Sequence, residues 1–515
     1  MSNKTRTEMP IGPQSSSPGA GAQESAAISS ALPALDWRLC VVVIVAVTAL
    51  TRASTYGNPL YSLDDQLYLM IGNAIVKGHI PYVEIWDRKP IGIFLIYAII
   101  AKIGGNPITT AWIVAGIFVS ATTYVIMLIA RYYTTKAAAM YSCLIYPIAL
   151  TMFKGSAGQS QLFYNLFIAL SFLMFLRAVG RRYQFIEKSA ALSSFLCGLA
   201  LIIRQTTIVE SLFVGIGFLT VCFSYTRSWR STARLGSLMA AIGAAPTLLT
   251  FVTFYELGHF QIYFDSSYLS IFRKSSDGFG TVMGAIYALI FITPVALMAI
   301  LGAVRRREEG LRTIYDKALL AWTIAALFEV LIIPRFYEYY SIPLLMPLIV
   351  SSSTLFIMPV LRICFLGGML VFAFGHGDIS RFHENQSSRT GFEQVVRYVR
   401  SNLKGGCLFV ADGPPLLYEA SGQPCRTRYL FPDHLAIATE ASAIETDSNA
   451  EARKILAQRP TVIVLQLHDY ALRRNPQTWP IVRNALATNY RLARRFRMPV
   501  ENRPATLTVW LRNPD

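Results

Sequence analysis

The chain has 515 residues, of which 53% are hydrophobic and only 15% are charged, and its mean hydropathy is +0.42. Soluble domains carry about 25% charged residues, and several apolar runs here approach the roughly 20 residues that span a bilayer. The net charge of +17 could indicate nucleic-acid binding, but Lys and Arg cluster in short segments between apolar runs. Cytoplasmic loops of membrane proteins have this pattern. The composition therefore predicts a polytopic α-helical membrane protein and argues against nucleic acid as a partner.

The N-terminal region differs from the apolar centre. Residues 1–35 are rich in Ser, Ala, Gly and Pro without periodicity, which predicts a disordered tail. The first apolar span is Trp37–Ala53. Because Lys4, Arg6 and Arg38 lie before or at its start, we expect a cytoplasmic N-terminus.

The apolar stretch Pro90–Ile103 decides the topology, because about 14 residues are few for a span. If it crossed the membrane, every later basic cluster, Arg305-Arg306-Arg307 among them, would lie outside. If it lies in the interface or dips in and returns, all of them lie inside, as the positive-inside rule favours. We therefore expect a first external loop over 54–107 with juxtamembrane helices, in a membrane domain over 36–377. About eleven spans are expected, at 37–53, 108–130, 137–153, 161–177, 189–203, 207–225, 235–254, 282–303, 317–333, 341–358 and 363–376.

Polar and charged residues return near Gly377, and we predict a small extracytoplasmic α/β domain over 378–515. If this domain is extracytoplasmic, Cys407 and Cys425 can form a disulfide. The expected strands are Cys407–Ala411, Thr461–Gln466 and Ala505–Leu511, and the expected helices are Phe392–Leu403, Ala450–Gln458 and Ile481–Ala487.

Two adjacent carboxylates, Asp64 and Asp65, follow the first span. A carboxylate beside apolar lipid can have its pKa raised and can take a proton from an acceptor hydroxyl or amine. The alternative is that Asp64 caps the helix expected over 64–77 and Asp65 favours its first turn. The two interpretations are compatible.

The segment Asp87-Arg88-Lys89-Pro90 brings two cations to the same loop. Lys and Arg supply the positive charge that a phosphate needs. The alternative is interfacial anchoring, in which both side chains reach toward lipid headgroups.

Two further clusters are expected at the outer ends of spans. Arg204-Gln205 separates two apolar runs, and a lone Arg at membrane depth indicates a functional site, with a phosphate as a natural partner. The alternative is a buried pair with Glu210 or Asp65. Arg335 precedes Tyr339-Tyr340, and these aromatic residues could instead form an interfacial belt, with Arg335 paired to Glu338.

Three motifs follow one another in the first loop, and two more occur later in the chain. They are Asp64-Asp65-x-x-Tyr68, Gly78-x-x-Pro81-Tyr82 and Trp86-Asp87-x-Lys89-Pro90, then Gly198-Leu-Ala with Arg204-Gln205, and Arg335 with Tyr339-Tyr340-x-x-Pro343. They resemble motifs of the GT-C glycosyltransferases, most of all those of the branch of protein O-mannosyltransferases and lipid A aminoarabinose transferases. In order along the chain they cover about residues 37 to 358.

The resemblance implies transfer of a sugar from a polyprenyl-phosphate donor to a lipid, glycan or protein acceptor on the extracytoplasmic face, at a bacterial inner membrane. It implies that Asp64 is the catalytic base and that Lys89 lies near the donor phosphate. Arg204 and Arg335 are further phosphate candidates. The remaining residues expected to bind donor or acceptor are Asp65, Tyr68, Asp87, Arg88, Tyr339 and Tyr340.

One departure from the family bears on metal use. The short loop 154–160, where many members have an acid, reads Lys154-Gly-Ser-Ala-Gly-Gln-Ser. Hard cations need several oxygen ligands, usually carboxylates. We therefore expect catalysis without a metal cofactor, although a divalent ion is possible.

A transporter or flippase for a lipid-linked or small solute is the main alternative, and a non-catalytic envelope scaffold is another. Transporters often place charged residues near the bilayer midplane within paired repeats. Here the charges gather at the outer ends of spans and no paired halves are evident, which favours the transferase.

Overall fold

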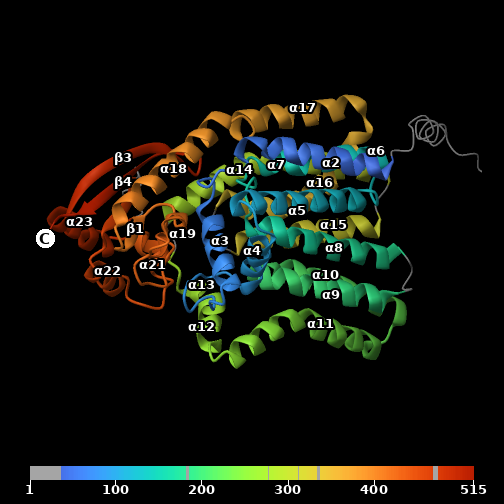
Figure 1. Cartoon of the computed structure of the whole chain (residues 1–515). Helices are drawn as coiled ribbons and strands as arrows, with labels where there is room; N and C mark the ends of the chain where they lie inside the picture. The colour runs from blue at the N-terminus through green and yellow to red at the C-terminus, as the bar shows by residue number, and fades with distance from the viewer. Residues whose placement is uncertain are drawn as a thin grey trace, which may run out of the picture.

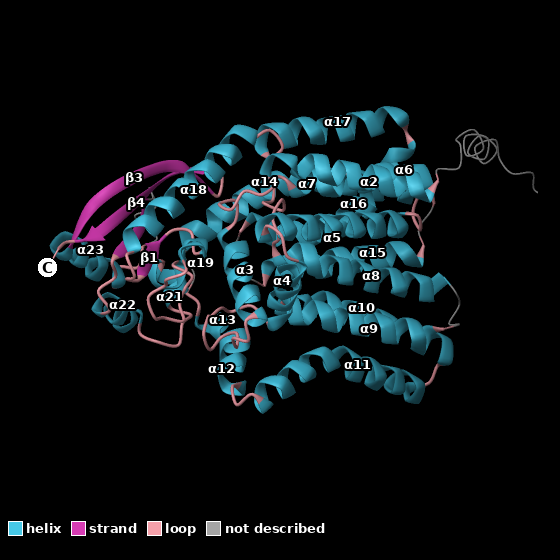
Figure 2. Cartoon of the chain, in the orientation of Figure 1, coloured by secondary structure: helices cyan, strands magenta, loops and turns pink. Residues whose placement is uncertain are grey.

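The computed structural model describes residues 36–180, 185–275, 278–310, 313–332, 337–467 and 474–514. Long helices lie side by side in a bundle, and a domain with a four-stranded sheet covers one end of it (Figures 1 and 2). The tail predicted over residues 1–35 lies outside the described residues.

In the described part of the chain, nine helices are long and apolar enough to cross a membrane, which confirms a multi-pass membrane protein. Two further predicted spans correspond to a short broken helix and to a helix that carries three charged residues. The nine are α2 (Trp37–Arg52), α5 (Pro107–Ala130), α8 (Ser160–Gly180), α9 (Ile186–Ile203), α10 (Ile208–Thr226), α11 (Trp229–Glu256), α14 (Gly278–Glu308), α16 (Ile342–Ser352, extended by a 3-10 turn over Ser353–Ile357) and α17 (Pro359–His376), and the other two are α6 (Lys136–Cys143) with α7 (Ile145–Leu150), and α15 (Ile314–Leu331).

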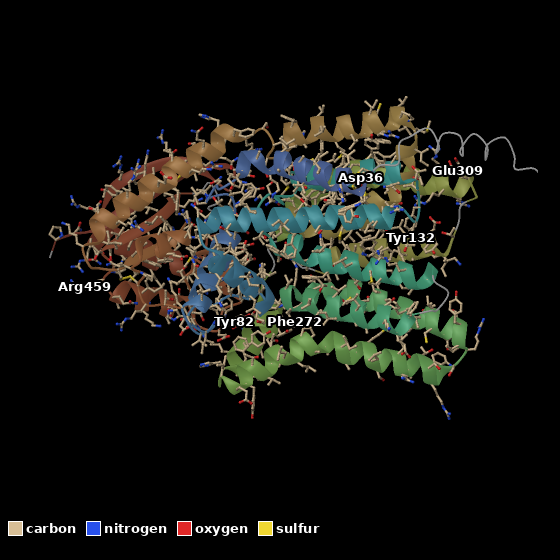
Figure 3. All side chains as sticks on the ribbon, turned by 45° about the vertical axis from the view of Figure 1, so that its right-hand side comes forward. Asp36, Tyr82, Tyr132, Phe272, Glu309 and Arg459 are labelled. Atoms are coloured by element: carbon tan, nitrogen blue, oxygen red, sulfur yellow. A yellow bond between two sulfur atoms is a disulfide. The ribbon has the colours of Figure 1, made fainter. Side chains whose placement is uncertain are left out.

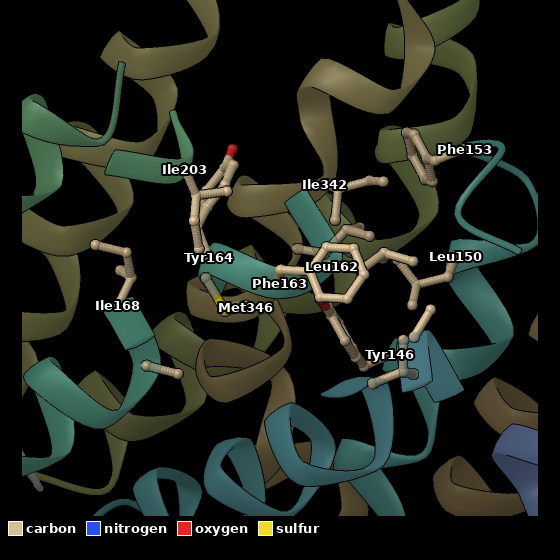
Figure 4. Packing of buried hydrophobic residues seen from close by; sticks show 14 of the residues in the cluster. Tyr146, Leu150, Phe153, Leu162, Phe163, Tyr164, Ile168, Ile203, Ile342 and Met346 are labelled. Carbon is tan, nitrogen blue, oxygen red and sulfur yellow. The ribbon is translucent and has the colours of Figure 1, made fainter. Parts of the chain in front are cut away.

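Burial separates the central helices from the outer ones. The span that contains α16 is 83% buried, whereas α11 and α17 are only 11% buried and present apolar side chains outward. Around α16 the core is aromatic and close-packed, with Tyr146, Phe163, Tyr164 and Met346 fully enclosed (Figure 4). The outer helices thus offer lipid-facing surface, and α16 organises the interior.

Two shorter helices lie across the end of the bundle that faces the sheet domain, α3 (Leu63–Val76) and α4 (Ile91–Ile103) (Figure 2). The start of α4 packs against the last turn of α9 at Ile202, and its end leads directly into α5. With 13 residues, α4 is about 20 Å long, too short for a span. This position agrees with the prediction that the apolar stretch Pro90–Ile103 does not cross.

The helix ends alternate between the two faces of the bundle. In Figure 3, Tyr132 and Glu309 lie at the end remote from the sheet domain, whereas Tyr82 and Phe272 lie at the junction with it. Two short helices between α11 and α14, α12 (Phe260–Phe264) and α13 (Ser270–Arg273), also lie at this junction (Figure 1).

The C-terminal domain begins with a long helix, α18, and contains one mixed sheet in the order β1-β2-β4-β3. The first pair is parallel and the other two are antiparallel, so that Val464 of β2 pairs with Val410 and with Val509. A disulfide joins Cys407 to Cys425. The elements are α18 (Phe382–Leu403), β1 (Leu408–Asp412), α19 (Leu416–Ser421), α20 (Asp433–Ala436), α21 (Ala438–Ala441), α22 (Ser448–Ala457), β2 (Val462–Leu467), α23 (Thr478–Asn489), β3 (Tyr490–Val500) and β4 (Arg503–Arg512).

The three predicted strands correspond to β1, β2 and β4, whereas β3 is not among the predicted strands. Its sequence, Tyr490–Val500, carries four exposed arginines, a composition typical of a loop. The strand forms because it lies at the edge of the sheet, where charged side chains face solvent and discourage pairing with other chains.

Gly72 sets the distance between the two crosswise helices. A Cβ at this position would lie 2.5 Å from the Tyr97 carbonyl carbon in the backbone of α4. We therefore expect Gly72→Ala to push the helices apart, destabilise the protein by about 1–3 kcal/mol and lower its Tm. Gly367→Ala is the matched control, since nothing lies within 4 Å of a Cβ there. Equal Tm values for the two variants would contradict this account.

Candidate active site

The first turn of α3 carries both carboxylates, and the cap of this helix is Ser62. The Ser62 hydroxyl accepts a hydrogen bond from the Asp65 N–H at 3.4 Å. The interpretation of Asp64 as the helix cap is therefore wrong, although both acids do lie in the first turn, where they favour the helix dipole.

Asp65 is buried and faces the loop between α7 and α8. Its carboxylate accepts hydrogen bonds from the Gly158 N–H at 2.6 Å and from the Ser62 hydroxyl at 3.2 Å. A side chain at position 158 would collide with the Tyr97 hydroxyl, so glycine is required for this approach. Burial raises the pKa of Asp65 to about 7, although the Gly158 hydrogen bond opposes the shift. These contacts tie α3 to the loop.

Asp64 is half-buried, and among the described residues its carboxylate has no hydrogen-bond or ion-pair partner. Asp64 lies one turn before Tyr68 on α3, on the same side of the helix. Asp64 is therefore the member of the pair that is free to accept a proton from a bound molecule.

Lys89 lies beside α3. Its ammonium donates to the Tyr68 hydroxyl at 2.9 Å, and its backbone carbonyl accepts from the Tyr82 hydroxyl at 2.9 Å. Asp87 is buried next to it, bonded to the Arg88 N–H, and burial raises its pKa while Lys89 and Arg88 lower it. Asp87 thus stabilises the turn through its hydrogen bond with the Arg88 N–H. The Lys89 ammonium has no carboxylate at ion-pair distance among the residues described.

Arg88 and a second cation, Lys274, share one carboxylate. Arg88 Nη2 lies 2.6 Å from one oxygen of Glu440, and Lys274 Nζ lies 2.6 Å from the other. Burial would raise the pKa of Glu440, but the two cations hold it well below its ordinary value. Arg88 is therefore part of a bridge between three segments and is not the headgroup anchor of the alternative interpretation.

Arg204 ends α9 and is buried. Its guanidinium lies over the Tyr340 ring at 4.5 Å, and its Nε donates to the Thr206 hydroxyl at 3.1 Å. The alternative of a pair with Glu210 or Asp65 does not hold, because Glu210 accepts from the Trp322 indole at 2.7 Å and Asp65 is bound elsewhere.

The site holds four cations: the Arg204 guanidinium over the Tyr340 ring, the Lys89 ammonium on the Tyr68 hydroxyl, and Arg88 and Lys274 on Glu440. They come from the first loop, the end of α9 and the segment after α13, and within the described chain only two of them have a carboxylate partner. Such a group of cations with an unpaired carboxylate nearby suits an anion such as a phosphate.

Arg335 lies outside the described residues. Tyr339 and Tyr340 stack edge to face at 4.8 Å, and Tyr337 lies parallel to Tyr339 at 5.3 Å. Glu338 pairs with Lys154 at 3.4 Å. The tyrosines therefore form an ordered cluster at the site.

Lys274 and Glu440 were not among the predicted site residues. Lys274 lies between α11 and α14, in a segment with several other charged and aromatic residues, so its sequence context did not single it out. Glu440 lies in a four-residue helix of the C-terminal domain and has no motif around it. No group of three or more His, Cys, Asp or Glu side chains that could hold a metal ion occurs among the residues searched, which are those the structure describes.

Residues 88–250 match the sequence profile of the family described as dolichyl-phosphate-mannose-protein mannosyltransferase. The structure is similar to ArnT from Cupriavidus metallidurans bound to undecaprenyl phosphate, with 14% identity and a TM-score of 0.56 over 93% of this chain and 98% of that one. The apo state of the same protein gives 14% identity and a TM-score of 0.59 over 91% and 97%. A search of curated proteins finds no match.

A third similar structure is the oligosaccharyltransferase of Archaeoglobus fulgidus tethered to an acceptor peptide. It has 10% identity and a TM-score of 0.50 over 83% of this chain and 68% of that one. Together these likenesses show that the chain has the GT-C glycosyltransferase fold with a small C-terminal sheet domain, and they confirm the fold that the motifs predict.

The raised pKa of Asp65 predicts a pH dependence of stability. The folded chain binds this proton more tightly than the unfolded chain, since the pKa rises from 3.8 to about 7. Stability from this group is therefore full below the unfolded value and is lost as pH rises through that range. In Asp65→Asn, whose amide oxygen can still accept from Gly158, we expect the drop in Tm between pH 5 and pH 8 to shrink. An unchanged drop would contradict the assignment.

Proposed function

We propose that this protein is a membrane glycosyltransferase that moves a sugar from a polyprenyl-phosphate donor to a lipid, glycan or protein acceptor. One observation carries the proposal: in a GT-C fold, Asp64, whose carboxylate has no partner among the described residues, lies one helical turn from Tyr68, which binds the Lys89 ammonium at 2.9 Å. A base next to a phosphate site is what transfer from a lipid phosphate requires.

Asp64 accepts the proton of the acceptor hydroxyl or amine as the acceptor oxygen or nitrogen attacks the anomeric carbon of the donor. The bond from that carbon to the phosphate oxygen breaks, and its electron pair leaves with the polyprenyl phosphate. Lys89 and Arg204 stabilise the negative charge that develops on the phosphate. A single displacement of this kind inverts the anomeric carbon.

The similar proteins support the choice of donor. One ArnT structure holds undecaprenyl phosphate, and the matching family is described by its dolichyl-phosphate-mannose donor. The archaeal oligosaccharyltransferase is tethered to an acceptor peptide, which supports a separate acceptor in general terms. We carry the lipid phosphate over to this chain as the class of donor.

We also place the site on the extracytoplasmic side of a bacterial inner membrane. The disulfide between Cys407 and Cys425 suits an oxidising compartment. The basic residues Arg131 and Arg305-Arg306-Arg307 flank Tyr132 and Glu309, at the opposite end of the bundle, as expected for a cytoplasmic face (Figure 3).

Single substitutions of Asp64 and Asp65 distinguish the proposed base from the neighbouring acid. Asp64→Asn removes the proton acceptor, and we expect transfer to fall by at least about 100-fold. Asp65→Asn keeps the contact with Gly158 and should retain most activity. Mass spectrometry of envelope lipids and glycans from wild-type, deletion and variant strains measures both and names the sugar and acceptor. A normal glycan profile in the Asp64→Asn strain would rule out Asp64 as the base and favour a transporter.

Metal independence is the second part of the proposal. The loop over 154–160 offers no carboxylate to complete a site with Asp64, and hard cations need several such ligands. We expect purified protein to keep its transfer rate in excess chelator. A loss of activity in chelator that one divalent ion restores would contradict this prediction.

A further inference from the structure

Trp86 of the first loop is part of the hydrophobic core of the C-terminal domain. Its side chain is fully buried among residues of that domain, Phe409, Leu435 and Ile463 among them. Its ring centroid lies 4.7 Å from that of His434, and its backbone N–H donates to the Arg428 carbonyl at 2.9 Å. The core of the sheet domain is therefore completed by a residue from the far end of the chain.

The disulfide fixes the segment that receives Trp86. Cys425 is bonded to Cys407, and its N–H donates to the Leu408 carbonyl of β1 at 2.9 Å. Three residues further along, Arg428 accepts the Trp86 N–H. The contact to the first loop thus rests on the edge of the sheet and not on a free loop.

Two residues after Trp86, Arg88 makes the second contact with the C-terminal domain through Glu440. Only 6% of the Glu440 side chain is exposed, and both of its oxygens lie 2.6 Å from a cation. Removal of one partner from a buried ion pair is strongly destabilising, because the remaining charges have no solvent to replace it. Without Glu440, Arg88 and Lys274 would be left as two like charges in a buried place.

Lys89 is the next residue after Arg88, and its ammonium binds the Tyr68 hydroxyl on α3, on the membrane-domain side of the loop. The loop is therefore held at one end in the core of the C-terminal domain, in the middle by Glu440, and at the other end by α3. The position of the Lys89 ammonium depends on both contacts to the domain.

We propose that the C-terminal domain is a working part of the site and that Glu440 is a positioning residue. It holds Arg88 and Lys274 side by side and thereby fixes the loop that presents Lys89 to an anion. The link to the donor phosphate rests on the proposed function, whereas the link between the domain and the loop does not.

The test uses full-length protein in nanodiscs, with Glu440→Gln compared with wild type. Hydrogen exchange measured by mass spectrometry should show the backbone amides within residues 84–90, those of 84–89, exchanging at least about tenfold faster in the variant. The apparent Kd for undecaprenyl phosphate, used as the probe, should rise about tenfold. Glu440→Asp, which keeps the charge, should recover most of both.

Glu451→Gln is the matched control. Glu451 is as buried as Glu440, with 6% of its side chain exposed, and it pairs with Lys454 within α22. This variant should leave the exchange of residues 84–90 and the Kd unchanged. If Glu440→Gln does not fold, Lys274→Met removes one of the two contacts and should still speed exchange in the same segment, by a smaller factor.

Unchanged exchange at residues 84–90 in Glu440→Gln would overturn the proposal whatever the activity. Equal acceleration in Glu451→Gln would show general loosening of the domain and would overturn it as well. Wild-type protein that does not bind the probe would count against the polyprenyl-phosphate donor, while faster exchange in Glu440→Gln would still support the contact between domain and loop.

Discussion

A charged side chain that is buried in a protein needs a partner, and this requirement distinguishes the charges of the site from one another. Asp65 satisfies it with a backbone N–H, and Arg88 and Lys274 satisfy it with one shared carboxylate. Asp64 and Lys89 lack a partner of opposite charge among the residues described. The paired charges build the walls of the site, and the two without such a partner are the ones that the proposed mechanism uses.

The walls come from distant parts of the chain, and close packing brings them together. Gly72 and Gly158 let α3 approach α4 and the loop before α8 without an intervening side chain. Pro90 stands at the start of α4, directly after the two cations. The close approach of the two crosswise helices thus brings α3, which carries the two acids, against α4, which begins two residues after Lys89.

Local patterns in the sequence predict the bundle and the acid pair, because apolar runs and helix-start residues are near neighbours in the chain. Partners that are distant in sequence leave no such signal. Trp86 belongs to a recognised motif, yet its side chain fills the core of the C-terminal domain. Glu440 stands in a short helix without a motif and still binds two cations of the site. Strand β3 has four exposed arginines, a composition typical of a loop. They are compatible with a strand because β3 lies at the edge of the sheet, and that position is not evident from the sequence.

The burial of Trp86 also has a consequence for the order in which the protein is made. Phe409 and Ile463, which share its core, are synthesised after every membrane-spanning helix. The Trp86 side chain therefore cannot be buried until the C-terminal domain has been synthesised. Contacts of such large sequence separation form late in folding. A nascent chain that has inserted all of its spans therefore still lacks the fixed loop, and the ribosome must finish the sheet domain before the site is whole.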